Sequence, residues 1–435
     1  MAHAVRALAR DRNYLSLWVG QFISIFGDRF TYLALLTVVV ARARDPRNPA
    51  AELALLPLAS FLPAILFGPW IGAIVDRSDT RRVLILSDLA RGLAVLAMIP
   101  ATIYGGLPAL FALVFALYVA NTFFLPARSA IVPLLVPAAQ LTEANSLATF
   151  AGVAATIAGS LAGGALIDRF GWRWGFALDA ATYFVSVIAL WRIRIAAPAP
   201  APRHEAAGDG PAASAASARY RKLAAEIREG FSILLRTPRA WMVTLTVMLL
   251  WMAGGVLHVA VPIMVGEGGR VASGVGALIA SAAVGMILGT LGIAARGAVA
   301  SPGKRLSVGL LGAGASISAF ALVPNGGAAM AVAFLAGLFV SILLVTAETA
   351  LQEAIAVEAR GRVFALRDMA ARLAVLATAG GAGWVVARGL PPRTAVLVAG
   401  ALLGATGLVG FRARWMESGA ASGASRDGDG ARGET

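Results

Sequence analysis

Long apolar stretches separated by short polar segments dominate the pattern of this 435-residue sequence. Each stretch has about 20 residues, the length that an α-helix needs to cross roughly 30 Å of hydrocarbon at about 1.5 Å per residue. The pattern predicts an all-α membrane protein with twelve spans, over residues 15–40, 53–75, 83–104, 107–127, 146–167, 174–191, 240–265, 273–295, 306–323, 328–350, 369–388 and 394–411.

The spans fall into two groups of six, before residue 192 and after residue 239. Between them, residues 196–217 are rich in alanine and proline, so we expect disorder there. Residues 219–236 regain a helical period, which indicates an amphipathic helix at the membrane surface. We expect an N-terminal six-helix bundle (1–192), a cytoplasmic linker (193–238) that is either a hinge or a passive tether, a C-terminal six-helix bundle (239–415) and a disordered tail (416–435).

Composition and charge support this topology. Hydrophobic residues make up 59% of the chain and charged residues 14%, which excludes an ordinary soluble domain. The formal net charge is +14, but the basic residues gather in the segments expected to be cytoplasmic, with Arg42, Arg44 and Arg47 as the exception. This bias orients helices during insertion, so we expect both termini inside and no nucleic-acid ligand. The chain has no cysteine, which excludes disulfides and thiolate metal sites.

A dense cluster of charge lies in the turn between the second and third spans. It reads Gly72-Ala-Ile-Val-Asp76-Arg77-Ser-Asp-Thr-Arg81-Arg82. This turn resembles the loop signature called motif A of the major facilitator superfamily. Asp79 and Thr80 stand where the family has a glycine before the final basic pair.

Other stretches resemble one branch of this superfamily, the drug and siderophore exporters that include macrolide-efflux and enterobactin-exporter types. They are Gly27-Asp28 in the first span, the loop signature around Arg128 after the fourth, Leu178-Asp179-Ala180 in the sixth, and the loop signature Arg360-Gly361-Arg362-Val363 after the tenth. The resemblance implies two six-helix bundles around a central cavity, alternating access, and export rather than uptake.

Asp28 and Arg29 lie almost at the centre of the first span. A charge there costs about 2.5 to 3.5 kcal/mol, so it must face a cavity or a partner. Asp28 is our first candidate for a proton carrier, and Arg29 is either a second candidate or its counter-ion. The alternative is a structural ion pair with a neighbouring helix.

Asp179 in span six, His258 in span seven and Glu348 in span ten are the remaining ionisable candidates for proton coupling. A lone histidine in a helix is more often a packing residue, although its titration near neutrality suits proton relay. Glu348 is near the inner end of its span, where contact with water would make it an ordinary surface acid.

Asp88 and Arg91 are three residues apart on one face of span three, so they can form an ion pair. We expect them to build a charge network with Asp76 and Arg77 of the motif A turn. Such a network would serve gating, as a conformational latch, and the alternative is a purely structural pair.

The fifth span contains glycines at close spacing, Gly152, Gly159, Gly163 and Gly164. The stretch resembles the antiporter signature called motif C, with Ser160 in place of the family's proline. Glycines at such spacing let helix backbones approach closely, so ordinary helix packing is an equal explanation.

Together these features favour a proton-coupled exporter of small amphipathic molecules, a multidrug-type antiporter of the cell membrane. We expect a monomer with no catalytic residues, no metal and no cofactor, whose partners are a small-molecule substrate, protons and the bilayer. The alternatives are an uptake transporter, or a receptor or scaffold that does not transport. A primary pump is disfavoured because the stretch around Gly303-Lys304 has the wrong spacing for a phosphate-binding loop.

The topology predicts where reporter fusions are active. A reporter joined after residue 105 should be active outside the cell, and one joined after residue 200 should be active inside, because an odd and an even number of spans precede them. A reporter active outside after residue 200 would overturn the arrangement.

Overall fold

The computed structural model describes residues 11–45, 48–194, 225, 227–296, 301–324 and 326–412. Regular structure within these ranges is helical throughout. Helices are the expected solution in hydrocarbon, because each satisfies its own backbone hydrogen bonds. The segment expected to be disordered in the linker and the expected disordered tail lie outside the described residues.

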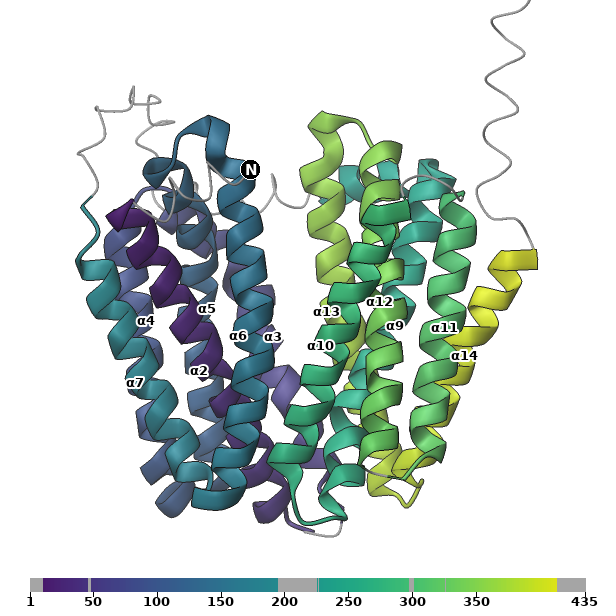
Figure 1. Ribbon diagram of the computed structural model, residues 1–435, viewed down its shortest axis with the longest axis horizontal. Coiled ribbons are helices and arrows are strands. Elements are labelled where there is room, and N and C mark those ends of the chain that lie inside the picture. The colour runs from purple at the N-terminus through teal and green to yellow at the C-terminus, as the bar shows by residue number, and fades with distance from the viewer. Residues whose placement is uncertain are drawn as a thin grey trace, which may run out of the picture. The chain divides into compact units, whose positions relative to one another are not determined.

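The first six membrane-length helices stand side by side as a bundle (Figure 1). They are α2 (Arg12–Arg42), α3 (Ala50–Val75), α4 (Thr80–Pro100), α5 (Gly106–Leu135), α6 (Leu141–Phe170) and α7 (Trp172–Trp191). α2 packs against α6 and α7, α4 packs against α5 and α7, and α3 packs against α5. α7 therefore connects the helix that contains Asp28 with the helix that contains Asp88.

The other six membrane-length helices are α9 (Pro238–Gly266), α10 (Val271–Arg296), α11 (Pro302–Leu322), α12 (Gly327–Ala354), α13 (Val357–Ala387) and α14 (Pro392–Arg412). α11 packs against both α12 and α14. These helices and the first six match the predicted spans in order, and the expected all-α membrane fold is confirmed.

The count of spans depends on how the stretch 80–135 is divided. Eleven continuous helical segments among the described residues are long and apolar enough to cross a membrane, and one of them is this stretch of 56 residues. A single straight helix of that length would extend about 84 Å. Instead a π-helical turn at Ala101–Gly105 and a positive φ of 69° at Gly106 separate α4 from α5, which fold back against each other. The stretch therefore provides two spans.

Several helices extend beyond the apolar stretches that predicted them. α5 continues to Leu135 and α13 already begins at Val357. Arg128 and the stretch from Arg360 to Arg362 consequently lie in helices, whereas the sequence analysis placed them in loops. A charged residue marks where the helix leaves the hydrocarbon, but it does not interrupt the backbone hydrogen bonds, so the helix continues beyond it.

Packing divides the chain into two compact units. The first comprises Met1–Glu226 with Val261–Ala280 and Gly383–Arg388, and the second comprises Ile227–Ala260, Ser281–Ala382 and Gly389–Thr435. Within the first unit, the Asp168 carboxylate accepts a hydrogen bond from the backbone N–H of Ser273 at 3.1 Å. The Asn48 amide donates to the carbonyl of Val386 at 2.8 Å. The domain boundaries expected at residues 192 and 238 stay a prediction.

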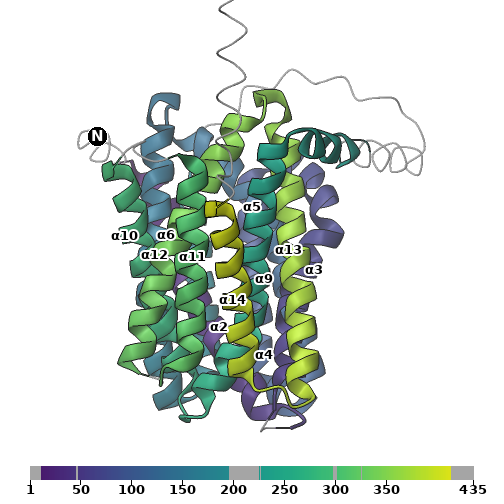
Figure 2. The ribbon, with the colours of Figure 1, turned by 90° about the vertical axis from the view of Figure 1, so that its right-hand side faces the viewer.

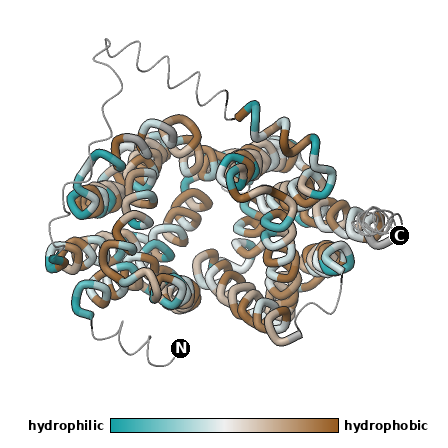
Figure 3. The backbone as a smooth tube through the Cα atoms, turned by 90° about the horizontal axis from the view of Figure 1, so that it is seen from above, coloured by the Kyte–Doolittle hydropathy of each residue, from teal (hydrophilic) through white to brown (hydrophobic). Residues whose placement is uncertain are grey.

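The outward faces of the helices are apolar. Figure 3 shows hydrophobic turns on the outer sides of the helices in each unit. Leu86, Trp191 and Leu402 are each more than 60% exposed. A surface of this kind suits contact with lipid, because the bilayer removes apolar side chains from water.

The described part of the linker forms a helix over residues 227–236. In Figure 2 it is the dark-teal helix that runs across the upright helices. Leu234 is 2% exposed, and the Phe231 ring packs edge-on against Trp241 with 6.4 Å between centroids. Glu229 accepts an ion-pair hydrogen bond from Arg362 at 2.6 Å. This helix is thus attached to the second unit through α9 and α13.

Leu234 and its neighbour Leu235 provide a matched test of this attachment. Leu235 is 51% exposed, so Leu235→Ala should change the free energy of unfolding by less than about 0.5 kcal/mol. Leu234→Ala removes a buried side chain and should cost about 2 to 4 kcal/mol, with faster tryptic cleavage at Arg228 and Arg236. Equal thermal stability and equal cleavage rates of the two variants would contradict the attachment.

Candidate functional site

Asp28 lies midway along α2 and is partly buried. The hydroxyl of Tyr183, on α7, donates a hydrogen bond to Asp28 Oδ1 at 2.5 Å. Both helices belong to the first unit. The acid expected to carry a proton is therefore held by a phenol rather than by a cation.

Asp88 and Arg91 form the buried ion pair that their spacing on α4 predicts. The Ser186 hydroxyl of α7 donates to the second carboxylate oxygen of Asp88 at 2.6 Å. Arg91 also donates to Asn121 Oδ1 of α5 at 3.4 Å. Three helices thus supply hydrogen bonds to this buried ion pair, and Arg91 Nε is left without a hydrogen-bond partner among the described residues.

Aromatic rings cover the guanidinium of Arg91. Its Cζ lies 3.9 Å from the ring centroid of Phe124 and 4.7 Å from that of Tyr183. A cation over an aromatic face is attracted by the negative face of the ring. Tyr183 consequently contacts Asp28 through its hydroxyl and Arg91 through its ring, and links the two charged centres.

Asp179 lies one turn before Tyr183 on α7 and is fully buried. Thr182 donates to Asp179 Oδ1 at 3.0 Å, whereas Oδ2 has no hydrogen-bond partner among the described residues. Gly27 of α2 packs directly against this carboxylate, since a Cβ at that position would overlap it. Asp179 therefore lies beside the residue that precedes Asp28.

These contacts define a cluster that we call the acid cluster, formed by Asp28, Asp88, Asp179, Arg91 and Tyr183. It contains three carboxyl groups and one guanidinium, and that guanidinium is already paired with Asp88. Unpaired charge is costly in a low-dielectric interior. The cluster can lower this cost by binding a proton, which gives it the chemistry of a proton site.

Arg29 is not the ion-pair partner of Asp28 in this structure. Its guanidinium lies 5.9 Å from the ring centroid of Tyr32, and its Nε is buried with no hydrogen-bond partner among the described residues. Its position one residue after Asp28 turns it about 100° around α2, away from the α7 contact.

His258 and Glu348 belong to the second unit, apart from the acid cluster. His258 is partly buried within α9. Glu348 on α12 is 44% exposed and accepts an ion-pair hydrogen bond from Arg367 of α13 at 2.5 Å. This geometry matches the expectation of an ordinary acid near water.

The motif A turn contains an unexpected helix cap. Asp79 accepts a hydrogen bond from the backbone N–H of Arg82 at 3.0 Å and so begins α4. Arg81 donates to the carbonyls of Leu190, at 3.2 Å, and of Trp191, at the end of α7. A cation at a helix C-terminus is favourable because of the helix dipole.

The expected network between this turn and the buried ion pair is not formed. Gly72 lies in the last turn of α3, and Asp76 and Arg77 follow as exposed side chains. No hydrogen bond or ion pair joins these two side chains to Asp88 or Arg91 in the described part of the chain. Twelve residues separate Asp76 from Asp88, which places the pair deeper in the bundle.

The glycines of α6 lie at helix contacts. Gly152, Gly159 and Gly163 face α2: a methyl group at Gly159 would lie 3.0 Å from Arg29 Cγ, and one at Gly163 would overlap the ring of Phe30. Gly159 and Gly163 allow the close approach that glycine rows provide in membrane helices, whereas a methyl group at Gly152 would lie at an ordinary contact distance of 3.8 Å from Ile25.

Gly164 faces a different neighbour. A methyl group there would lie 2.7 Å from Cα of Ser273, in the first turn of α10. This geometry accounts for the row by packing alone, and the antiporter role suggested by the motif C resemblance stays a prediction.

The two signatures that lie in helices have different environments. Arg128 on α5 is partly buried. On α13, Arg360 donates from Nε to the carbonyl of Ile355 at 3.2 Å, and Arg362 holds Glu229 of the linker helix. Gly361 has open space where a Cβ would project.

No group of acids, histidines and cysteines suited to a metal occurs among the described residues.

The sequence analysis missed the polar partners on α7. Thr182, Tyr183 and Ser186 follow Asp179 by three, four and seven residues, the spacing of one helix face. This spacing is visible in the sequence, but it is equally typical of a helix face that only packs against a neighbouring helix. The structure distinguishes this face by its hydrogen bonds, from Tyr183 to Asp28 and from Ser186 to Asp88.

The sequence profile of the Major Facilitator Superfamily matches residues 17–332. An uncharacterized MFS-type transporter, YfiS, of Bacillus subtilis is 28% identical over 41% of this chain and 42% of its own length. Macrolide efflux protein A of Streptococcus pyogenes is 30% identical over 30% of this chain and 32% of its own length. The putative bacilysin exporter BacE of Bacillus amyloliquefaciens is 29% identical over 42% and 44%. The matches thus span less than half of these curated relatives.

Solved structures share the fold. A mutant of the nucleoside transporter NupG superposes with a TM-score of 0.71 at 11% identity, covering 91% of this chain and 99% of that one. A bacterial homologue of the iron transporter ferroportin gives 0.67 at 14% identity, covering 91% and 98%. At such low identity these likenesses concern the fold alone. Because the profile matches well over half of its residues, the chain belongs to the Major Facilitator Superfamily.

Proposed function

We propose that this transporter exports small amphipathic molecules in exchange for protons, by alternating access across the plasma membrane. In this proposal it works as a monomer with both termini in the cytoplasm and performs no catalysis. The acid cluster is the proton site, and Asp28 is the group that changes its protonation during the cycle.

The observation that supports coupling is the excess of carboxyl groups over cations in the acid cluster. Asp88 forms an ion pair with Arg91 and accepts a hydrogen bond from Ser186, so its negative charge is already neutralised. Among the described residues, Asp28 accepts its side-chain hydrogen bond from a phenol and has no cation as a partner. A carboxyl group in this position can be neutral in one conformation and charged in another, and a difference in proton affinity between two states is what couples them.

The names of two relatives favour export over uptake. Macrolide efflux protein A and the putative bacilysin exporter are both named for outward movement. Uptake is the competing function, and it would reverse the sign of accumulation. A receptor or scaffold would change no accumulation at all.

Accumulation in cells with and without the protein tests the proposal. Macrolides, dyes and siderophores should be screened with and without a protonophore. Lower accumulation that the protonophore restores supports proton-driven export. Higher accumulation, or efflux that the protonophore leaves intact, would contradict it.

Asp28→Asn should abolish outward concentration of the substrate. Asparagine keeps the volume of the protonated acid but cannot release a proton, so substrate can still exchange while the gradient no longer drives it. Uphill efflux and substrate exchange should be measured in the same proteoliposomes. Asp28→Glu should keep part of the uphill activity.

Glu348→Gln is the matched control, because it removes an acid that is 44% exposed and lies outside the cluster. It should retain uphill efflux. If Asp28→Asn still concentrates substrate outward and still responds to a protonophore, coupling lies elsewhere, and Asp179, His258 and Glu348 become the candidates.

Asp76→Asn should slow transport while leaving the amount of protein in the membrane unchanged. The Asp76 side chain is exposed at the motif A turn and makes no ion pair among the described residues, so the fold does not depend on it. Initial efflux rates should be compared with protein levels in isolated membranes. A normal rate would remove the motif A acid from the transport cycle.

A further inference from the structure

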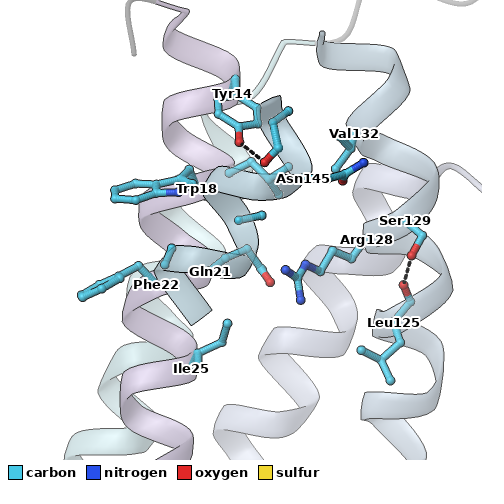
Figure 4. Close-up of a pocket in the computed structure, with 14 residues that line it drawn as sticks. Tyr14, Trp18, Gln21, Phe22, Ile25, Leu125, Arg128, Ser129, Val132 and Asn145 are labelled. Atoms are coloured by element: carbon cyan, nitrogen blue, oxygen red, sulfur yellow. Dashed lines mark hydrogen bonds between the residues drawn. The ribbon is translucent and has the colours of Figure 1, made fainter. Parts of the chain in front are cut away.

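A cavity of about 390 Å³ lies within the first unit, between α2, α5 and α6. Figure 4 shows side chains from these helices around it. Volumes of roughly 300 to 1,000 Å³ are typical of sites for small organic molecules. The acid cluster does not form its lining, so the cavity is a separate feature of this unit.

Arg128 projects into this cavity (Figure 4). It forms no ion pair and no hydrogen bond with the described residues, and the charged group that acts on it is Arg91, of the same sign. Arg91 itself is neutralised by Asp88. Arg128 is therefore a partly buried cation with no counter-ion in the described part of the chain, an arrangement that costs free energy unless an anion binds.

Gln21 is a second polar group at the cavity that lacks a partner. It is 8% exposed, its Nε2 has no hydrogen-bond partner among the described residues, and its side chain points toward Arg128 in Figure 4. Buried amides are normally satisfied. Figure 4 places the amide oxygen of Gln21 toward Arg128, so an anion bound by Arg128 accepts from Nε2 once the amide group has turned about its terminal bond.

Three other donors around the cavity are already used, whereas the exposed amide of Asn145 forms no side-chain hydrogen bond with the described residues. Tyr14 donates to the carbonyl of Ala144 at 2.8 Å, and Trp18 Nε1 donates to that of Leu147 at 3.3 Å. Ser129 bonds within its own helix. The groups left to bind a ligand are thus the guanidinium of Arg128 and the amides of Gln21 and Asn145, donors that match a carboxylate or a phosphate.

Two aromatic rings of α2 also line the cavity, and in Figure 4 they extend away from Arg128. Trp18 and Phe22 stack with 6.0 Å between ring centroids and 23° between planes, and Ile25 lines the next turn of α2. The cavity therefore presents a positive end and an aromatic side. A ligand that fits both has an anionic group and an apolar or aromatic body.

We propose that this cavity is the substrate site and that it selects amphipathic organic anions, with the carboxylate or phosphate bound by Arg128 and Gln21 and the apolar part packed on Trp18 and Phe22. The inference rests on the proposed transport function and names the substrate class. If it holds, a negatively charged ligand binds more tightly than a neutral ligand of the same shape.

Binding of a matched pair of probes tests the inference. Dansyl-phenylalanine has a carboxylate, and dansyl-phenylalanine amide has the same body without the charge. The full chain, purified in a neutral detergent, should bind the acid about 10 to 100 times more tightly than the amide, the usual effect of a charged hydrogen bond. Equal affinities would overturn the proposal.

Arg128→Gln should abolish the preference for the acid while leaving the affinity for the amide unchanged. Arg128→Lys should keep part of the preference, because a point charge remains without the planar guanidinium. Arg192→Gln, at an exposed position outside the cavity, is the control of equal charge change and should behave as the unmodified protein. A preference that survives in Arg128→Gln would place the anion site elsewhere.

Two further outcomes decide ambiguous cases. If Arg128→Gln binds neither probe, the lysine variant decides: a preference for the acid supports the site, and no preference overturns it. Octyl phosphate should displace the acid at a lower concentration than inorganic phosphate does. Equal displacement by the two would contradict the amphipathic part of the proposal.

The binding test is independent of the coupling test. It needs no proton gradient, so transport that ignores a protonophore would refute proton coupling and leave the anion site standing. Equal affinities of the unmodified protein for the acid and the amide would instead refute the anion site and leave proton coupling standing.

Discussion

A charge inside hydrocarbon has no water to solvate it, and the first unit of this transporter is arranged around that constraint. Arg91 is the best compensated of these charges. It is paired with Asp88, hydrogen-bonded to Asn121 and covered by the rings of Phe124 and Tyr183. The same tyrosine then reaches Asp28. The ion pair of Asp88 and Arg91 thus positions Tyr183, which contacts the acid that has no cation as a partner among the described residues. Packing and the proposed proton site therefore depend on the same side chains.

The sequence was most informative where a requirement is local. A run of about 20 apolar residues suffices to identify a span, and Asp88 and Arg91 could be paired from their spacing on one helix. Helix ends were less predictable, since hydropathy marks the edge of the hydrocarbon and not the last helical hydrogen bond. Arg128 shows the difference: it ends the apolar run of its span, yet α5 continues for seven more residues.

The candidate site was predicted only in part, because its essential contacts join distant parts of the chain. Asp28 and Tyr183 are 155 residues apart, and no local pattern in the sequence pairs them. Asp28 and Asp179 were recognised separately as acids at membrane depth, but their meeting depends on how α2 packs on α7. Similarly, Arg128 was singled out by its signature, whereas the absence of a counter-ion among the described residues follows only from the packing of α5 in three dimensions.

The division into packing units has a mechanical consequence for three helices. α9, α10 and α13 each belong to both units, and the boundaries fall after Ala260, Ala280 and Ala382. Near the first boundary Pro262 removes one backbone hydrogen bond from α9, and near the third α13 contains Gly380, Gly381 and Gly383. Proline and glycine lower the bending stiffness of a helix. Bending of α9 and α13 is therefore easiest at these points, which lie inside helices long enough to cross the membrane.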